Sequence, residues 1–181
     1  MKHNAQHLSL NDLIRILKKS VSVMPPLQMV KALQRLIVTD KEIAEHAFFN
    51  EHRYSRNVVT RDKDFEILII CWKSGQRSLI HDHGESFGVV KVLKGILTES
   101  VFIPAFNGMI KAMGSKDYQS GDVQIEDHST IHQVSNLRPE QDNAISLHVY
   151  VPPLNRMKIY ELYDLDIRPV SAELHNYGSG I

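Results

Sequence analysis

Apolar residues in the first part of the chain recur at helical spacing. They form two stripes: Leu10, Leu13, Ile14 and Leu17, and then Met29, Val30, Leu33, Leu36 and Ile37. Ser9 stands where a helix cap is expected, and the pair Pro25–Pro26 opens the second stripe. Thr39 and Glu42 have the spacing of a capping box, which predicts a third helix over 40–49.

After Tyr54 the pattern changes to short runs rich in β-branched and aromatic residues. Glycine, proline and small polar residues separate these runs. The predicted strands are Phe65–Trp72, Ser78–His83, Phe87–Leu93, Ile96–Ile103, Val123–Glu126, Ile131–Ser135 and Ala144–Val151. Many short strands at this spacing are typical of a sandwich or barrel, so we expect a mostly β fold.

We expect one domain over residues 1–181. Its expected parts are a helical N-terminal cover over 1–50, a β-barrel over 51–163 and a tail over 164–181. The length suits a single hydrophobic core, and no internal repeat or long linker divides the chain.

The amino-acid composition limits which partners and which cellular location we expect. Lys and Arg total 21, as do Asp and Glu, so the formal net charge is zero and no basic field attracts nucleic acid or anionic membrane. The first residues lack an apolar signal core, and no apolar run approaches the ~20 residues of a membrane span. Cys71 is the single cysteine and is expected to be buried and inert. We expect a cytoplasmic protein with no nucleic-acid, membrane or obligate protein partner.

A pair of histidines is the first candidate for chemistry. His81 and His83 are two residues apart in a predicted strand, so both imidazoles point to one face. Five residues separate Gly75 from this pair, and Gly95 lies twelve residues after it, which matches the outline of the first cupin motif.

A third histidine matches the second cupin motif. Gly121 is followed by ten residues, then His132, three more residues, and Asn136. The two motifs together predict that His132 joins His81 and His83 on one metal ion. His148 is the alternative third ligand.

The first motif departs from its usual form. A cupin normally has a glutamate four or five residues after the second histidine, but Phe87 and Gly88 stand there, and Glu85 is out of register. We therefore expect three neutral imidazoles and no carboxylate. An ion with three neutral ligands keeps its full charge and favours an anionic ligand such as a thiolate. The ligands leave zinc, copper, iron and nickel open, and three histidines also form hydrolytic zinc sites.

A second polar row lies in the alternating run Ala144–Val151. Ser146, His148 and Tyr150 share one face, where serine and tyrosine could each bond one nitrogen of the imidazole. Tyr54 and Arg56 are also two apart and could enter the same cavity. The alternative is that this row faces water and that the arginine is a surface charge.

These features together resemble the cysteine dioxygenase family of thiol dioxygenases, which are cupins. The matching stretches are Tyr54–Asn57, Ile70–Trp72, His81–His83, Lys91–Gly95, His132 and Ser146–Pro153. The resemblance covers residues 50–155 and combines the candidate metal ligands with both polar rows. It implies a cupin-type double-stranded β-helix, or jelly-roll, barrel with an N-terminal helical segment.

The resemblance also implies roles for single residues. The metal would be Fe(II), held by His81, His83 and His132. Arg56 would pair with the substrate carboxylate, and Tyr54 would line the same pocket. Tyr150 would hydrogen-bond near the carboxylate and O2, supported by His148 and Ser146. Cysteine would be oxidised to cysteine sulfinic acid.

Two positions refine this picture. Animal members carry a cysteine at the position of Gly88, crosslinked to the tyrosine that matches Tyr150, so no such crosslink is expected here. A sister group acts on 3-mercaptopropionate and has glutamine at the position of Arg56, so arginine favours cysteine.

Other functions remain open at this point. The first is 3-mercaptopropionate dioxygenase activity. The second is a metal-binding cupin without oxygenase activity, such as a sensor or storage module. The third is a zinc or nickel isomerase or hydrolase on the same ligands. Arg56 and the Ser146 row favour the oxygenase, because a mere metal binder needs neither a carboxylate clamp nor a phenol relay.

Overall fold

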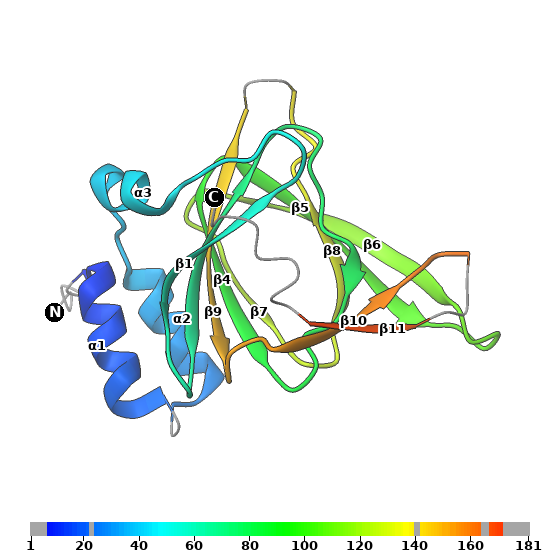
Figure 1. Ribbon diagram of the computed structural model, residues 1–181, viewed down its shortest axis with the longest axis horizontal. Helices are drawn as coiled ribbons and strands as arrows, with labels where there is room; N and C mark the ends of the chain where they lie inside the picture. Colours follow the sequence, from blue (N-terminus) through cyan, green and yellow to red (C-terminus); the bar gives the residue numbers. More distant parts are fainter. Residues whose placement is uncertain (1–6, 22–23, 140–141, 164–166, 172–181) are drawn as a thin grey trace, which may run out of the picture.

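The computed structural model describes residues 7–21, 24–139, 142–163 and 167–171. Within these ranges, three helices precede eleven strands (Figure 1). The helices are α1 (Leu10–Ser20), α2 (Pro26–Arg35) and α3 (Asp40–His46). The strands are β1 (Ser55–Arg61), β2 (Glu66–Trp72), β3 (Ile80–His81), β4 (Phe87–Lys94), β5 (Ile96–Pro104), β6 (Ile110–Gln119), β7 (Val123–Glu126), β8 (Ile131–Ser135), β9 (Ala144–Val151), β10 (Arg156–Tyr160) and β11 (Arg168–Ser171).

The strands form two antiparallel sheets that face each other across the interior. One has the order β1-β2-β9-β4-β7, and the other has the order β11-β10-β3-β8-β5-β6. The helices lie on the outer side of the first sheet, as Figure 1 shows at its left. This is the mostly β fold that the sequence predicts.

Strands β2 and β9 show how the first sheet separates core from cavity. Ile67 and Leu147 pack with α1 and α2 in one apolar cluster on the outer face. Leu68 and Trp72 belong to a second cluster inside the barrel. Because side chains alternate along a strand, the inward face of β9 is left to Ser146, His148 and Tyr150.

The helices begin where the sequence predicts. Ser9 and Thr39 both close capping boxes, with Asp12 and Glu42 as their partners. The third helix ends at His46, three residues before the expected end. In the described part of the chain, no helix has the length and apolar character of a membrane span.

Four strands of the structure were not predicted from the sequence: β1, β6, β10 and β11. One predicted strand is too long. The predicted strand Ser78–His83 is reduced to β3, because only its two central residues join a ladder. β6 is exposed along nearly its whole length, so it has no apolar face to reveal it. β1, β10 and β11 also carry charged residues that hide the alternation. β11 lies in the expected tail and pairs with β10, whereas the rest of that tail is outside the described residues.

Candidate active site

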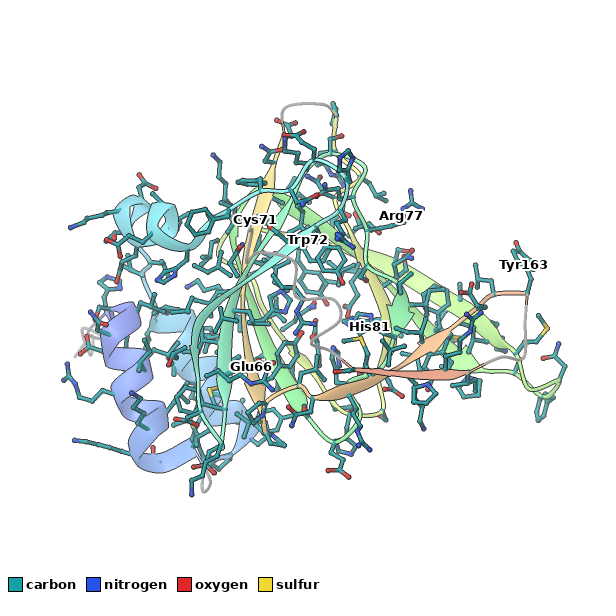
Figure 2. All side chains as sticks on the ribbon, viewed as in Figure 1. Glu66, Cys71, Trp72, Arg77, His81 and Tyr163 are labelled. Carbon is teal, nitrogen blue, oxygen red and sulfur yellow. The ribbon has the colours of Figure 1, made fainter. Side chains whose placement is uncertain are left out.

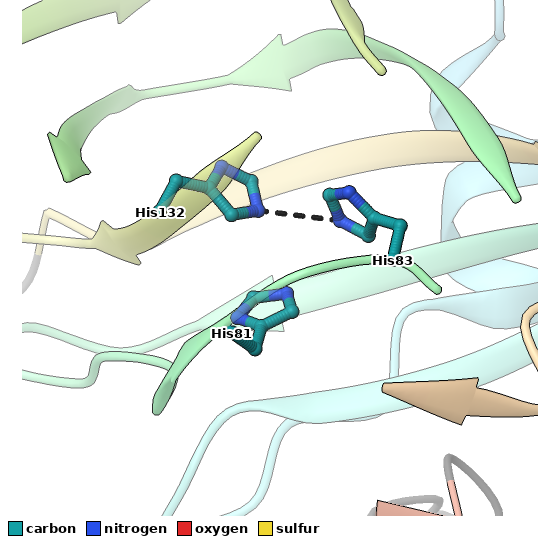
Figure 3. Close-up of side chains that lie close together, drawn as sticks. All are labelled: His81, His83 and His132. Atoms are coloured by element: carbon teal, nitrogen blue, oxygen red, sulfur yellow. Dashed lines mark hydrogen bonds between the residues drawn. The ribbon is translucent and has the colours of Figure 1, made fainter. Parts of the chain in front are cut away.

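Three imidazoles converge between the two sheets. His81 lies in β3, His83 lies two residues beyond it, and His132 lies in β8, directly opposite His81. The Nε2 atoms of His83 and His132 are 3.2 Å apart (Figure 3). One nitrogen of each ring falls within 4.8 Å of the others. The structure therefore brings the three predicted ligands together.

Hydrogen bonds at Nδ1 orient two of these rings. His81 Nδ1 donates to Leu79 O at 2.9 Å, and His132 Nδ1 donates to Glu99 Oε1 at 2.7 Å. With the proton on Nδ1, the lone pair of each ring is at Nε2, as is typical of histidine ligands. Two nitrogens ~2.1 Å from one ion and at right angles lie ~3.0 Å apart, so the 3.2 Å between His83 and His132 fits a shared metal.

The electrostatics also suit metal binding. Burial, with the neighbouring imidazoles, holds the pKa of His83 well below its usual range. The neutral imidazole is the form that binds a metal. His148, the alternative third ligand, uses both nitrogens in hydrogen bonds to its neighbours in β9. The geometry therefore favours His132.

A buried carboxylate that the sequence reasoning did not single out lies beside the triad. Glu126, at the end of β7, is 1% exposed, and its Oε2 lies 3.3 Å from His83 Nε2. Burial raises the pKa of this carboxyl, because the charged form loses its water. Sequence reasoning missed Glu126 because it occupies no motif position. It reaches the site only because β7 pairs with β4.

The polar row of β9 forms a continuous hydrogen-bonded chain. Trp72 Nε1 donates to Ser146 Oγ at 3.0 Å, and Ser146 Oγ lies 2.8 Å from His148 Nε2. His148 Nδ1 lies 3.1 Å from Tyr150 Oη. All four side chains are buried. The alternative in which this row faces water is therefore wrong.

This chain fixes where the protons lie. Ser146 Oγ already accepts from Trp72, and its own proton has one acceptor among the described residues, His148 Nε2. Burial, and next the charge of Arg56, hold the pKa of His148 well below its usual range, so the ring is neutral. Its single proton is then on Nδ1 and is donated to Tyr150 Oη. The tyrosine O–H is left to donate into the cavity.

Arg56 lines the same cavity as the metal candidates. The cavity wall includes Tyr54, Arg56, His81, His132, His148, Tyr150 and Glu126. Figure 2 shows His81 between the two sheets and Tyr163 at the periphery of the molecule. Arg56 is 5% exposed, so it is no surface charge, and Tyr54 stacks on Trp72 with ring centroids 4.6 Å apart.

Two smaller expectations concern Cys71 and Gly88. Cys71 is buried, as expected, and burial raises the pKa of its thiol to about 11, which disfavours the reactive thiolate. Gly88 lies opposite Tyr150 in the β4–β9 ladder. A Cβ at this glycine would lie 2.8 Å from Tyr150 Cε1. Glycine therefore makes room for the tyrosine ring.

Solved structures support the fold. An uncharacterized conserved protein with a double-stranded β-helix domain from Klebsiella pneumoniae matches 66% of this chain and 94% of its own, with a TM-score of 0.52 and 19% identity. A Thermus thermophilus protein matches 61% of this chain and 94% of its own, with a TM-score of 0.51 and 18% identity. The expected cupin-type double-stranded β-helix is confirmed.

Sequence relatives identify the family. Cysteine dioxygenase type 1 of Homo sapiens is 32% identical over 163 residues, which are 84% of this chain and 79% of the human protein. The Danio rerio protein of the same name is 29% identical over the same shares. The family model described as cysteine dioxygenase type I matches residues 2–162. The chain therefore belongs to the cysteine dioxygenase type I family of oxygenases.

Proposed function

We propose that this chain is an iron-dependent thiol dioxygenase that oxidises L-cysteine with O2 to cysteine sulfinic acid. Fe(II) would be held by His81, His83 and His132, and the partners of the site would be the small thiol and O2. The similar proteins of Homo sapiens and Rattus norvegicus are named cysteine dioxygenase type 1, and this similarity supports the proposed activity. The cytoplasmic location expected from the sequence remains a prediction.

The observation that carries the substrate proposal is that buried Arg56 has an unpaired N–H donor. Its guanidinium is buried in the wall of the cavity, and its Nε has no hydrogen-bond partner among the described residues. Glu66 Oε1 is 3.9 Å away, and both oxygens of Glu66 already accept from other groups, Leu154 N and Arg61 Nη1. A buried donor without an acceptor is costly. A substrate carboxylate would supply that acceptor and match the charge.

Tyr150 lines the same cavity and supports the same pose. Burial raises the pKa of its phenol well above the usual range, so it stays a hydrogen-bond donor. His148 and Ser146 hold it in place. Its O–H can therefore donate to the substrate carboxylate or to O2 without giving up its proton.

The iron, held by His81, His83 and His132, would supply the redox chemistry of thiol oxidation. The protein supplies position: Arg56 would bind the carboxylate, and the three imidazoles, of which His81 and His132 border the same cavity, would hold the ion. A substrate with a thiol and a carboxylate at the two ends of a short chain suits this arrangement.

O2 consumption tests the proposal. The purified chain is loaded anaerobically with Fe(II) and given L-cysteine or 3-mercaptopropionate. Uptake with cysteine, with sulfinic acid as the product, supports the full proposal. A clear preference for 3-mercaptopropionate keeps the chemistry but overturns the substrate. No uptake with either thiol, despite bound iron, contradicts thiol dioxygenase activity.

A further inference from the structure

The segment that carries His83 leaves the sheet directly after His81. β3 ends at His81, which pairs with Ile159 of β10. In the same register the next pair is Asp82 and Lys158, and such a pair normally exchanges two backbone hydrogen bonds. Asp82 N does donate to Lys158 O at 3.1 Å, but Lys158 N donates to the side-chain Oδ1 of Asp82 at 3.0 Å. The carboxylate thus takes the place of a backbone carbonyl where the ladder ends.

The same carboxylate holds the turn that follows. Asp82 Oδ1 also accepts from Gly84 N at 3.0 Å, which closes a turn around His83. Gly84 has a φ of +56°, and a Cβ on it would lie 2.8 Å from Arg156 O, so glycine lets this turn pack against β10. Asp82 Oδ2 accepts from Tyr160 Oη at 2.8 Å. Asp82 is buried, and both of its carboxylate oxygens are engaged.

His83 depends on this turn more than the other two imidazoles do. The Nδ1 atoms of His81 and His132 each have an acceptor that orients the ring. Nδ1 of His83 is buried and has no hydrogen-bond partner among the described residues. The place of the His83 ring is therefore set by packing and by its backbone, which lies between two residues that the carboxylate holds, Asp82 and Gly84.

We propose that Asp82 is a positioning residue of the metal centre. Its carboxylate fixes the backbone on both sides of His83 against β10, so that the imidazole meets those of His81 and His132. Asp82 borders a separate cavity, together with Gly84, and so acts through its neighbours in the chain. This inference rests on the proposed metal site and is independent of which thiol is oxidised.

Cobalt binding tests the role of Asp82 without any turnover. The metal-free chain is titrated with Co(II), and the visible absorption of the ion reports its affinity and its coordination geometry. Asp82→Ala removes every hydrogen bond of the carboxylate, and we expect ~10-fold weaker binding and an altered spectrum. Asp82→Asn keeps an oxygen that can accept from the two backbone N–H groups, so it should restore most of the lost affinity.

A turn elsewhere in the chain provides the matched control. Asp62 Oδ1 accepts from Asp64 N at 2.8 Å and from Phe65 N at 3.2 Å, in the connection between β1 and β2. Asp62→Ala therefore removes a carboxylate of the same kind from a turn that carries none of the three histidines. It should leave the Co(II) affinity within about twofold and the spectrum unchanged. Equal losses in Asp62→Ala and Asp82→Ala would mean a general loss of stability and would overturn the proposal.

Two further outcomes separate this proposal from the proposed function. Wild-type affinity and spectrum in Asp82→Ala overturn the positioning role and leave the three-histidine site and the dioxygenase proposal intact. If the wild-type chain does not bind Co(II), the metal site itself is wrong, and both proposals fail.

A crystal structure of the Co(II)-bound wild-type chain gives an answer even if Asp82→Ala does not fold. The proposal expects His83 Nε2 at ~2.0–2.1 Å from the ion while Asp82 Oδ1 still accepts from Gly84 N and Lys158 N. A bound ion with these two hydrogen bonds broken overturns it.

Discussion

Arg56 is a buried cation whose hydrogen-bonding capacity the protein fills only in part. Arg61 and the backbone of Leu154 engage Glu66, the nearest carboxylate. This differs from a structural ion pair, in which each charge is fully matched. The incomplete match is what a binding site for a small carboxylate requires.

Replacing Arg56 by glutamine should therefore weaken substrate binding. Loss of a charge-assisted hydrogen bond costs ~1.5–3 kcal/mol, so the KM for cysteine should rise by about 10- to 150-fold. Steady-state O2 uptake measures this value, and Arg77→Gln serves as the control because Arg77 is exposed. An unchanged KM in Arg56→Gln would show that the carboxylate binds elsewhere.

Gly88 is a position where one methyl group should matter. Its added Cβ would lie 2.8 Å from Tyr150 Cε1, a distance that real Cβ contacts do not reach, so the ring must shift. Overpacking of this kind costs ~1–3 kcal/mol. We expect Gly88→Ala to lower the free energy of unfolding by that amount in urea melts and to lower kcat by displacing the phenol. Wild-type stability and turnover would contradict the close packing of Tyr150 on β4.

At the scale of elements, Lys91 ties the helices to the barrel. It lies in β4, and its Nζ donates to Leu33 O at 2.8 Å and to Leu36 O at 2.7 Å, at the carboxyl end of α2. The ammonium thus donates to the carbonyl of Leu36 and adds a second donor to that of Leu33, which already accepts from Leu36 N.

We expect Lys91→Met to destabilise the chain by ~1–3 kcal/mol, because the Leu36 carbonyl loses this donor and that of Leu33 keeps only Leu36 N, while the apolar stem is kept. Chemical unfolding followed by circular dichroism measures the change. Lys94→Met is the matched control, since Lys94 is at the exposed end of the same strand. Equal loss in both variants would mean that the contact to α2 contributes nothing specific.

The elements that the sequence predicts are those with one apolar face. β2 and β9 alternate cleanly, and the capping boxes mark α1 and α3, so all four are recovered from local pattern. β6 escapes prediction because its hydrogen bonds to β5 hold it in place without burial of a side-chain face. The alternation of apolar and polar residues reflects which face of a strand is buried. A strand without a buried face therefore shows no alternation in its sequence.

The site residues, like the strands, were predictable only where a local sequence pattern marks them. The three histidines were predictable from motif spacing, and the row from Ser146 to Tyr150 was predictable because its members alternate along one strand. Glu126 was not, because its approach depends on which residue of β4 lies opposite it. Such register is a property of the folded sheets and is absent from the spacing of residues along the chain.

At the scale of the whole molecule, the site joins the two sheets. The three histidines come from β3, the residues after it and β8, all on the six-stranded side. Arg56 and Tyr150 come from β1 and β9 in the five-stranded sheet. The cavity exists only when the sheets face each other, so a ligand that binds it should stabilise the folded state as a whole.

A metal ion should therefore raise the melting temperature of the chain. An ion at 100 times its Kd that binds only the folded state adds ~2.7 kcal/mol, which corresponds to about 5–10 °C for a chain of this size. Differential scanning calorimetry with and without Co(II) measures the shift. His81→Ala should abolish it, because two imidazoles bind the ion far more weakly than three. His52→Ala should retain it, since His52 is exposed and lies outside the triad. A shift of equal size in both variants would show that the metal binds elsewhere in the molecule. The contact between the two sheets would then be stabilised by apolar packing alone.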